Sequence, residues 1–331
     1  MSSSPPEPLL ELSRALPQSW QRFLDIYEPL RPDLYRYCRY LTRSPWDAED
    51  LAQEAMARGF ATLGRMGEPP ANPKAWLFRV AYNLWVDRMR QHRDVPAVES
   101  STAAAVEPRD RREAAGTLIG KLAPQERAAV VLKDVFELTL EEIAEALSTT
   151  TGAVKAALHR GRGKLVEPEP VELPAPDRSV IDAFCDAFNA RDLPRLTALL
   201  LDTAAIEVVG THVEYGPEAA GKGVFQGMLY GSQRMAEADT RGGMEPRFIQ
   251  DVLPQPPRAE VRVHRGEALL LLWYAHRDGE AVRAINRIEV EGGRIARLQN
   301  YFFTPEFIAE VCGELAIPFR SNGYKSCLSG G

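Results

Sequence analysis

Residues 138–165 read LTLEEIAEALSTTTGAVKAALHRGRGKL, and this stretch decides the fold of the middle of the chain. Thr139 followed by Glu142 forms a capping box, a pattern that marks the start of a helix. Apolar residues recur at helical spacing on both sides of the polar segment 148–152. The stretch therefore predicts two helices joined by a tight turn, which is a helix-turn-helix.

The second of these helices has an apolar face and a basic face. Val154 and Leu158 fall on one side, whereas Lys155 and His159 fall on the other. Residues 155–164 contain four cations and no acid, in a chain with a net charge of -6. A local basic excess is typical of a helix that contacts nucleic acid, although a solvated surface helix gives the same pattern when it stands alone.

Three parts of this stretch, EIAEAL, GAVK and LHRGRGKL, resemble region 4 of the extracytoplasmic-function (ECF) sigma factors. Region 4 of that family reads the -35 element of a promoter. Ala153 and Ala157 stand where the family usually has polar residues, so the helix has few donors for base edges, and we expect a modest affinity for the -35 element. The resemblance implies -35 contacts from Thr151, Lys155, His159, Arg160, Arg162 and Lys164.

An acidic segment lies upstream of the helix-turn-helix. DAEDLAQE, residues 47–54, begins a predicted helix with acids in its first turn, as the helix dipole favours. It resembles region 2.2 of the sigma factors, which docks on the clamp of core RNA polymerase. The resemblance implies core-polymerase contacts from Asp50, Gln53 and Glu54. An acidic first turn taken alone needs no partner.

The next segment, NPKAWLFRVAYNLWVDRMR at residues 72–90, resembles regions 2.3 and 2.4, which melt and read the -10 element. Helical spacing places three of its polar residues on one face, close to Phe78 and Tyr82. Cations beside aromatic rings suit the unstacked bases of melted DNA. The family captures a flipped base in the loop before this helix, here residues 64–73. The resemblance thus implies -10 contacts from Asn72, Lys74, Arg79, Asn83 and Arg90.

The composition of the chain limits the classes of protein to which it can belong. The chain has 331 residues, of which 45% are hydrophobic, enough for two or three cores. Its longest apolar run, 268–275, is short of the roughly twenty residues that span a bilayer, and MSSSPPEP does not resemble a signal peptide. We expect a cytoplasmic protein with no membrane partner. Four scattered cysteines without a CxxC pair predict no metal site, and nothing indicates a cofactor.

From residue 177 onward the sequence changes character: apolar residues first recur at helical spacing, and strand-like segments follow. Five segments have the composition or alternation of strands, and Asp278-Gly279 and Gly292-Gly293 mark hairpin turns. We expect two or three helices against a curved antiparallel sheet, an α+β cone. FCDAFNARDLPRLTALL and RIEVEGGRIARLQNYF resemble a SnoaL-like domain. The expected strands are 205–210, 259–264, 268–276, 281–290 and 294–303.

The expected fold is therefore multidomain, with two all-α sigma domains followed by an α+β SnoaL-like cone. Between the domains lie a flexible linker and a Pro-rich, extended linker. The tail is either disordered or docked on the sigma regions. In order, the segments are a disordered arm at 1–19, region 2 at 20–94, the flexible linker at 95–114, region 4 at 115–166, the Pro-rich linker at 167–176, the cone at 177–318 and the tail at 319–331.

Taken together, the resemblance implies an alternative sigma factor rather than an enzyme, with core RNA polymerase and promoter DNA as partners. In sigma factors with a SnoaL-like extension, the extension docks on the sigma regions and tunes promoter activity; the Asp-Gly-Gly-Gly motif of the better known subgroup is absent here. Two alternatives remain open. One is an isomerase or hydrolase fused to DNA-binding modules, and the other is a ligand-responsive helix-turn-helix repressor, which would not require DAEDLAQE.

The cone also has the shape to hold a small molecule at its wide end. Spacing alone does not place an acid, a base and a nucleophile at one site, so no catalytic residue is predicted. A ligand-binding pocket stays open as an expectation. Its candidate lining residues are His212, Tyr215, Tyr274, His276, Arg283 and Asn286.

Overall fold

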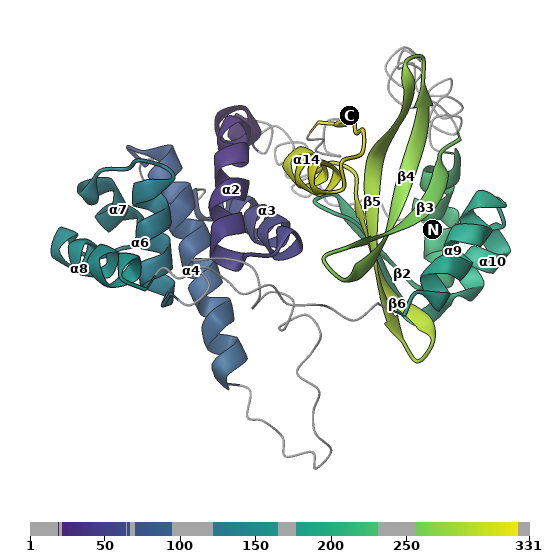
Figure 1. Cartoon of the computed structure of the whole chain (residues 1–331), viewed down its shortest axis with the longest axis horizontal. Helices are drawn as coiled ribbons and strands as arrows, with labels where there is room; N and C mark the ends of the chain where they lie inside the picture. The colour runs from purple at the N-terminus through teal and green to yellow at the C-terminus, as the bar shows by residue number, and fades with distance from the viewer. Residues whose placement is uncertain are drawn as a thin grey trace, which may run out of the picture. The chain divides into compact units, whose positions relative to one another are not determined.

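In the computed structural model the chain divides between residues 172 and 173 into two compact units, a helical unit and an α+β unit (Figure 1). Both expected linkers, and the expected arm apart from residue 19, lie outside the described residues. No helix in the described parts is long and apolar enough to cross a membrane, and no group of three or more His, Cys, Asp or Glu in those parts is placed to hold a metal ion. The structure describes residues 19, 22–63, 65–66, 70–94, 122–164, 177–230 and 256–323.

The first bundle of the helical unit follows a short 3-10 helix, η1 (Glu28–Leu30), and consists of α2 (Arg31–Thr42), α3 (Pro45–Leu63) and α4 (Pro73–Asp94). Arg43 ends α2 in the left-handed conformation, and its N–H donates to the carbonyl of Arg39. The apolar stripe of α2 is buried in the bundle, as are Trp76, Phe78 and Trp85 of α4, whereas Tyr82 is half-buried. Its largest members are Leu34, Tyr37, Leu41, Trp76, Phe78 and Trp85.

A buried ion pair joins α2 to α3. The side chains of Arg31 and Glu49 form this pair and are almost completely buried. Nε2 of Gln53 also donates to Oε1 of Glu49 at 2.7 Å. Removing one partner of such a pair costs about 3 to 5 kcal/mol, because the other charge stays buried without it. Glu49 of the acidic segment of α3 therefore serves the fold.

The second bundle consists of α6 (Pro124–Asp134), α7 (Leu140–Ala146) and α8 (Thr151–Arg162). Oγ1 of Thr139 accepts from the N–H of Glu142 at 3.2 Å, and the Glu142 carboxylate accepts from the N–H of Thr139 at 2.8 Å. Thr150 caps α8 in the same way, accepting from the N–H of Ala153 at 3.2 Å. The predicted capping box and helix-turn-helix are confirmed.

The α+β unit is built on a six-stranded sheet in the order β2-β1-β6-β5-β4-β3. β1 and β6 run parallel and all other neighbours run antiparallel, so the predicted all-antiparallel sheet is wrong. Alternation along the chain reveals strands but not which distant strands become neighbours, and β2 was too short to detect. The strands are β1 (Leu200–Val208), β2 (His212–Tyr215), β3 (Arg258–His264), β4 (Glu267–His276), β5 (Gly279–Glu291) and β6 (Arg294–Tyr301).

Helices cover both faces of this sheet, so the predicted α+β fold class is confirmed (Figure 1). Phe184 and Phe188 of α9 pack with Leu196 of α10 over one face, in a core that includes Leu270 and Leu298 of the sheet. On the other face Phe307 of α14 stacks on Tyr301 of β6, with 4.4 Å between ring centroids. These helices are α9 (Ser179–Asn189), α10 (Leu193–Ala198), α11 (Gly216–Lys222) and α14 (Pro305–Glu314).

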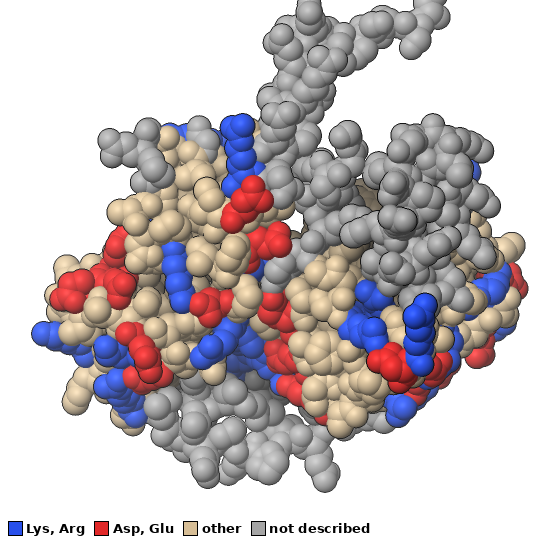
Figure 2. All heavy atoms as spheres, turned by 90° about the horizontal axis from the view of Figure 1, so that it is seen from above, with Lys and Arg blue, Asp and Glu red and all other residues tan. Residues whose placement is uncertain are grey.

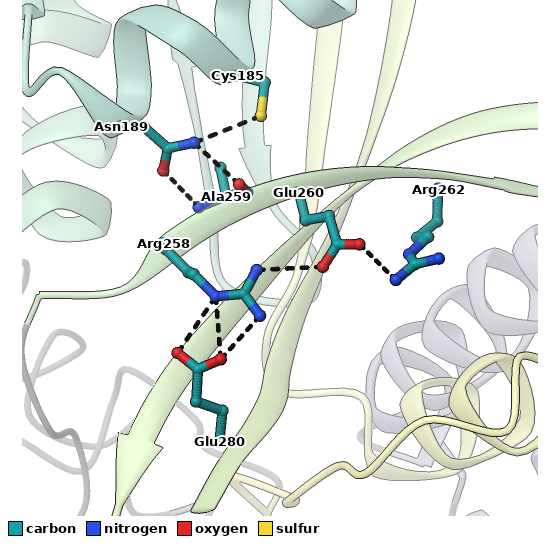
Figure 3. A network of polar contacts seen from close by, with 7 residues as sticks. All are labelled: Cys185, Asn189, Arg258, Ala259, Glu260, Arg262 and Glu280. Atoms are coloured by element: carbon teal, nitrogen blue, oxygen red, sulfur yellow. Dashed lines mark hydrogen bonds and ion pairs between the residues drawn. The ribbon is translucent and has the colours of Figure 1, made fainter.

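The last residue of α9 closes part of the outer edge of β3 (Figure 3). The Asn189 carboxamide accepts from the N–H of Ala259 at 2.7 Å and donates to its carbonyl at 2.9 Å, as a neighbouring strand would. Arg258 pairs with Glu280 of β5 and with Glu260, which also pairs with Arg262. Charges along an edge strand oppose pairing with another chain, so this edge is blocked.

The segment after α14 returns to β5. The N–H of Val282 donates to the carbonyl of Pro318 at 2.9 Å, and the carbonyl of Val282 accepts from the N–H of Arg320 at 2.9 Å. Asn322 donates to the carbonyls of Arg283 and Phe302 and accepts from the Arg283 guanidinium. Residues 319–323, placed in a tail on sequence grounds, thus pair with the α+β unit; residues 324–331 lie outside the described part.

The glycine that begins α11, directly after β2, tests this fold. Gly216 has a φ of +79°, and a Cβ there would lie 2.9 Å from the carbonyl oxygen of Asp202, a backbone atom that cannot move aside alone. We expect Gly216→Ala to lower the free energy of unfolding of the α+β unit by about 1 to 3 kcal/mol. Hydrogen exchange of β1 amides measures this. Gly227→Ala, where a Cβ meets no atom within 4 Å, is the matched control, and an equal loss in both variants would contradict the prediction.

Candidate polymerase and nucleic-acid interfaces

Most basic residues of α8 are engaged by acids of α6. Nε of Arg160 lies 3.0 Å from Oε1 of Glu126, and Nζ of Lys164 lies 2.8 Å from Oε2 of the same carboxylate. The Arg162 guanidinium binds the carboxylate of Asp134 through two nitrogens. Three of the four cations predicted to contact DNA phosphates therefore also hold the second bundle together.

Glu126 is the acceptor at the centre of these contacts. Its residue is only 4% exposed, and its carboxylate also accepts from the N–H of Ala123 at the start of α6. The hydrogen bond from Lys164, with smaller contributions from Arg160 and the backbone, lowers the pKa of the Glu126 carboxyl below its usual value. Close approach of α8 to α6 is possible because residue 161 is glycine: a Cβ there would lie 2.8 Å from Cγ2 of Val130.

Two polar side chains of α8 are left on its outer face. Lys155 and His159 are exposed, and within the described part of the chain no hydrogen bond or ion pair engages them. Thr151, the first residue of α8, is half-buried. The helical unit carries Lys and Arg interspersed with Asp and Glu on the face that Figure 2 shows, as these ion pairs require. The recognition face is therefore small.

The residues predicted to contact the -10 element lie on and before α4. Asn83 and Arg90 are exposed, Arg79 is half-buried, and Arg90 is 3.5 Å from the carboxylate of Asp87. Asn72 caps α4, because its Oδ1 accepts from the N–H of Ala75 at 3.0 Å. Of the expected base-capturing loop, residues 64 and 67–69 lie outside the described part.

Lys74, the remaining -10 candidate, already has partners. Its ammonium pairs with the carboxylate of Asp33. It also lies 5.7 Å from the centroid of the Phe78 ring and 5.5 Å from that of Phe136. Phe136 belongs to the turn after α6, so the second bundle contacts the side chain that was expected to meet DNA.

The three residues predicted to contact polymerase are half-buried on α3. Oε2 of Glu54 accepts from the Arg88 guanidinium of α4 at 2.6 Å, and Gln53 is held by Glu49 at 2.7 Å. Asp50 also lies in α3, closer to the start of the helix than Gln53 and Glu54. The fold thus fixes the orientation of the Gln53 and Glu54 side chains.

The structure brings only some of the six candidate pocket residues together, because Tyr274 and His276 of β4 lie near Arg283 of the neighbouring β5 but far from β2. His212 and exposed Tyr215 lie on β2, four strands from Tyr274 and His276 on β4, a separation of about 19 Å across the sheet. Tyr274 is buried in the core, which raises the pKa of its hydroxyl, and burial lowers the pKa of His276. Protein groups satisfy the other two: Arg283 binds Asn322, and Asn286 accepts from Asn300 at 2.7 Å.

The matches to known families fall on the two helical bundles. The Sigma-70 region 2 family matches residues 26–95, and the Sigma-70 region 4 family matches residues 112–165. The ECF RNA polymerase sigma factor SigW of Bacillus subtilis is 34% identical over 164 residues, which cover 43% of this chain and 86% of SigW. The chain belongs to the ECF sigma factors.

Relatives of this sigma factor differ in length. SigG of Mycobacterium tuberculosis, also an ECF RNA polymerase sigma factor, is 29% identical over 222 residues, and the chain spans 60% of the length of SigG. The crystal structure of SigJ from the same organism covers 86% of this sigma factor with 21% identity and a TM-score of 0.30. The first bundle is region 2 and the second bundle is region 4.

The sequence did not predict the residues that hold region 4 together or the residues that connect region 4 to region 2. Pro124 and Glu126 carry a helix-start signal, with Pro at the first position and an acid at the third. Nothing in the sequence reveals that Glu126 binds cations 34 and 38 positions later, or that Arg127 and Phe136 contact region 2.

Replacing the central carboxylate of region 4 tests its role. We expect Glu126→Gln to lower the stability of region 4 by about 1 kcal/mol, the value of a charged hydrogen bond discounted for half-exposed partners. Hydrogen exchange of α6 and α8 amides at neutral pH should then be about fivefold faster. Because folding lowers the pKa of Glu126, its contribution is complete above the usual carboxyl pKa and is lost as the pH falls through the lowered value.

The difference between Glu126→Gln and the native chain should therefore shrink as the pH falls below about 4.5. Lys155→Ala is the control, because Lys155 has no acidic partner among the described residues and should leave exchange unchanged. Equal exchange in Glu126→Gln and the native chain at neutral pH would contradict a structural role for the carboxylate.

Proposed function

We propose that this chain is an alternative sigma factor that binds core RNA polymerase, opens and reads the -10 element through region 2, and contacts the -35 element through region 4. One observation carries the proposal: both promoter-reading families match in one chain, which is also similar to SigW over 86% of that protein. A repressor or a fused enzyme would not need the region 2 match.

Region 2 would supply most of the promoter recognition. Asn83 and Arg90 are exposed on α4, and Arg79 lies on the same face. The resemblance to the family implies contacts with the melted DNA strand at all three positions. The acidic helix α3 would dock on core polymerase through Asp50, Gln53 and Glu54. The pairing of Glu54 with Arg88 and of Gln53 with Glu49 supports this, since pre-oriented side chains lose less entropy on binding.

Region 4 would bind the -35 element weakly by itself. Lys155 and His159 are available on its outer face, whereas Arg160, Arg162 and Lys164 would have to contact phosphates while still bound to Glu126 and Asp134. Attachment to region 2 and to the polymerase compensates for this, because a tethered module binds at a high effective concentration. The -35 contact would then position the complex more than specify sequence.

The α+β unit would regulate the two sigma regions and catalyse no reaction. Its polar candidates lie on distant strands of the sheet or are satisfied by protein groups, which supports a role in contact rather than in chemistry. The proposal implies a cytoplasmic protein, because bacterial transcription takes place there.

Run-off transcription with purified core RNA polymerase tests the proposal. The full chain should direct specific initiation, and a version ending at Leu173, between the two units, should do so with a changed yield of at least a few fold. Core polymerase alone is the control for background initiation. No specific transcript from either version would contradict the sigma function, and equal yields would contradict regulation by the α+β unit.

A further inference from the structure

One face of α8 points away from the rest of region 4. At about 3.6 residues per turn, Lys155, Ala156 and His159 lie on the side away from the buried face, to which Val154 belongs, and all three are exposed. Gly152, one turn earlier, is also exposed. We name Gly152, Lys155, Ala156 and His159 the recognition face. In a helix-turn-helix, the second helix presents such a face to base edges in the major groove.

The structure changes which alanine of α8 can meet DNA. Ala157 stands where the sigma family often has a polar residue, but it is completely buried, so its small size serves packing. Its neighbour Ala156 is exposed, and an exposed position tolerates larger side chains. At Gly152, a Cβ would meet only Oγ1 of Thr150, at an ordinary 3.8 Å. Packing therefore does not require these two residues to be small, whereas close approach to a groove does.

Cations flank the recognition face on both sides. Arg160 and Lys164 lie on one flank, where they bind Glu126, and Arg162 lies on the other, where it binds Asp134. Side chains in these places suit the phosphates on the two sides of a groove. Phosphate contacts position a protein without reading sequence, so any reading of bases falls to the recognition face between them.

The recognition face carries few groups that can read a base. It has no Asn or Gln side chain, so it cannot form the paired hydrogen bonds by which those residues read adenine. The Lys155 ammonium is a donor only, which suits the N7 and O6 acceptors of guanine. The Ala156 methyl is apolar, and the apolar group that a base presents in the major groove is the C5 methyl of thymine.

We propose that region 4 reads an A·T pair of the -35 element by contact of the Ala156 methyl with the C5 methyl of thymine, while Lys155 donates to a guanine of the neighbouring pair. The two residues are adjacent in the recognition face, so their targets are adjacent on the DNA. The inference rests on the proposed function, and it adds base identities that the proposed function leaves open.

Removal of one methyl group from the promoter tests the Ala156 contact. Each thymine of the -35 element, on either strand of a promoter that the full chain transcribes with core RNA polymerase, is replaced singly by deoxyuridine, which lacks only the C5 methyl. At one position the replacement should weaken promoter binding about fourfold, the value of one buried methyl group. Binding is measured by mobility shift at one fixed salt concentration, because phosphate contacts depend on salt.

Ala156→Gly removes the methyl group of the protein. This variant should bind the thymine and deoxyuridine promoters equally, so the ratio of the two affinities falls from about four to about one. Ala61→Gly, the same change at an exposed position of α3, is the matched control and should keep the ratio of the native chain. Because both promoters are compared with the same sample, partial unfolding of a variant does not change the ratio.

Lys155→Ala tests the second contact. Loss of a base contact should abolish the preference for guanine at the pair beside the thymine, whereas loss of a phosphate contact would weaken binding to all sequences equally. Binding is compared for the four possible base pairs at that position. Equal weakening on all four promoters would overturn the assignment of Lys155 to guanine.

Two results would overturn the Ala156 contact: deoxyuridine that leaves binding unchanged at every -35 position, or a ratio of the native size in Ala156→Gly. Run-off transcription by the same complexes separates these results from failure of the proposed function. Specific transcripts without a methyl effect would contradict only this reading of the -35 element, whereas the absence of any specific transcript would contradict both proposals.

Discussion

The buried carboxylate of Glu126 is the interaction on which the promoter-reading part of this chain depends. It sits in the first turn of α6, accepts from the backbone of its own helix start and binds Arg160 of α8 and Lys164 just after α8. The contact fixes the recognition helix against the rest of region 4. The Glu126 carboxylate also neutralises cations that would otherwise be available to DNA phosphates. The same side chains therefore contribute to the stability of region 4 and to its affinity for DNA.

The same sharing occurs throughout the helical unit. Lys74 pairs with Asp33, and Glu54 pairs with Arg88, although sequence resemblance assigns Lys74 to DNA and Glu54 to polymerase. Surface ion pairs of this kind contribute roughly 0 to 1 kcal/mol each, so a partner can replace them at small cost.

Local signals in the sequence predicted local structure well. The capping box at Thr139, the acidic start of α3 and the glycine pair at 292–293, both with positive φ, each formed the expected element. Pairings distant in sequence were not predictable, because periodicity records which face of an element is apolar but not what covers it. The parallel pairing of β1 with β6 and the position of Phe136 are of this kind. The sequence therefore predicted which residues make up the candidate site, whereas the partners of those residues came only from the fold.

The central activity proposed for this chain is the opening of promoter DNA. The permanganate reactivity of thymines at the -10 element measures this opening directly. A promoter identified by run-off transcription would be probed with core polymerase, with the chain, and with both. The account predicts reactive thymines only when both are present, and weaker reactivity when Arg79 and Asn83 are replaced together by Ala. Unreactive thymines in a complex that contains polymerase, chain and promoter would contradict the account.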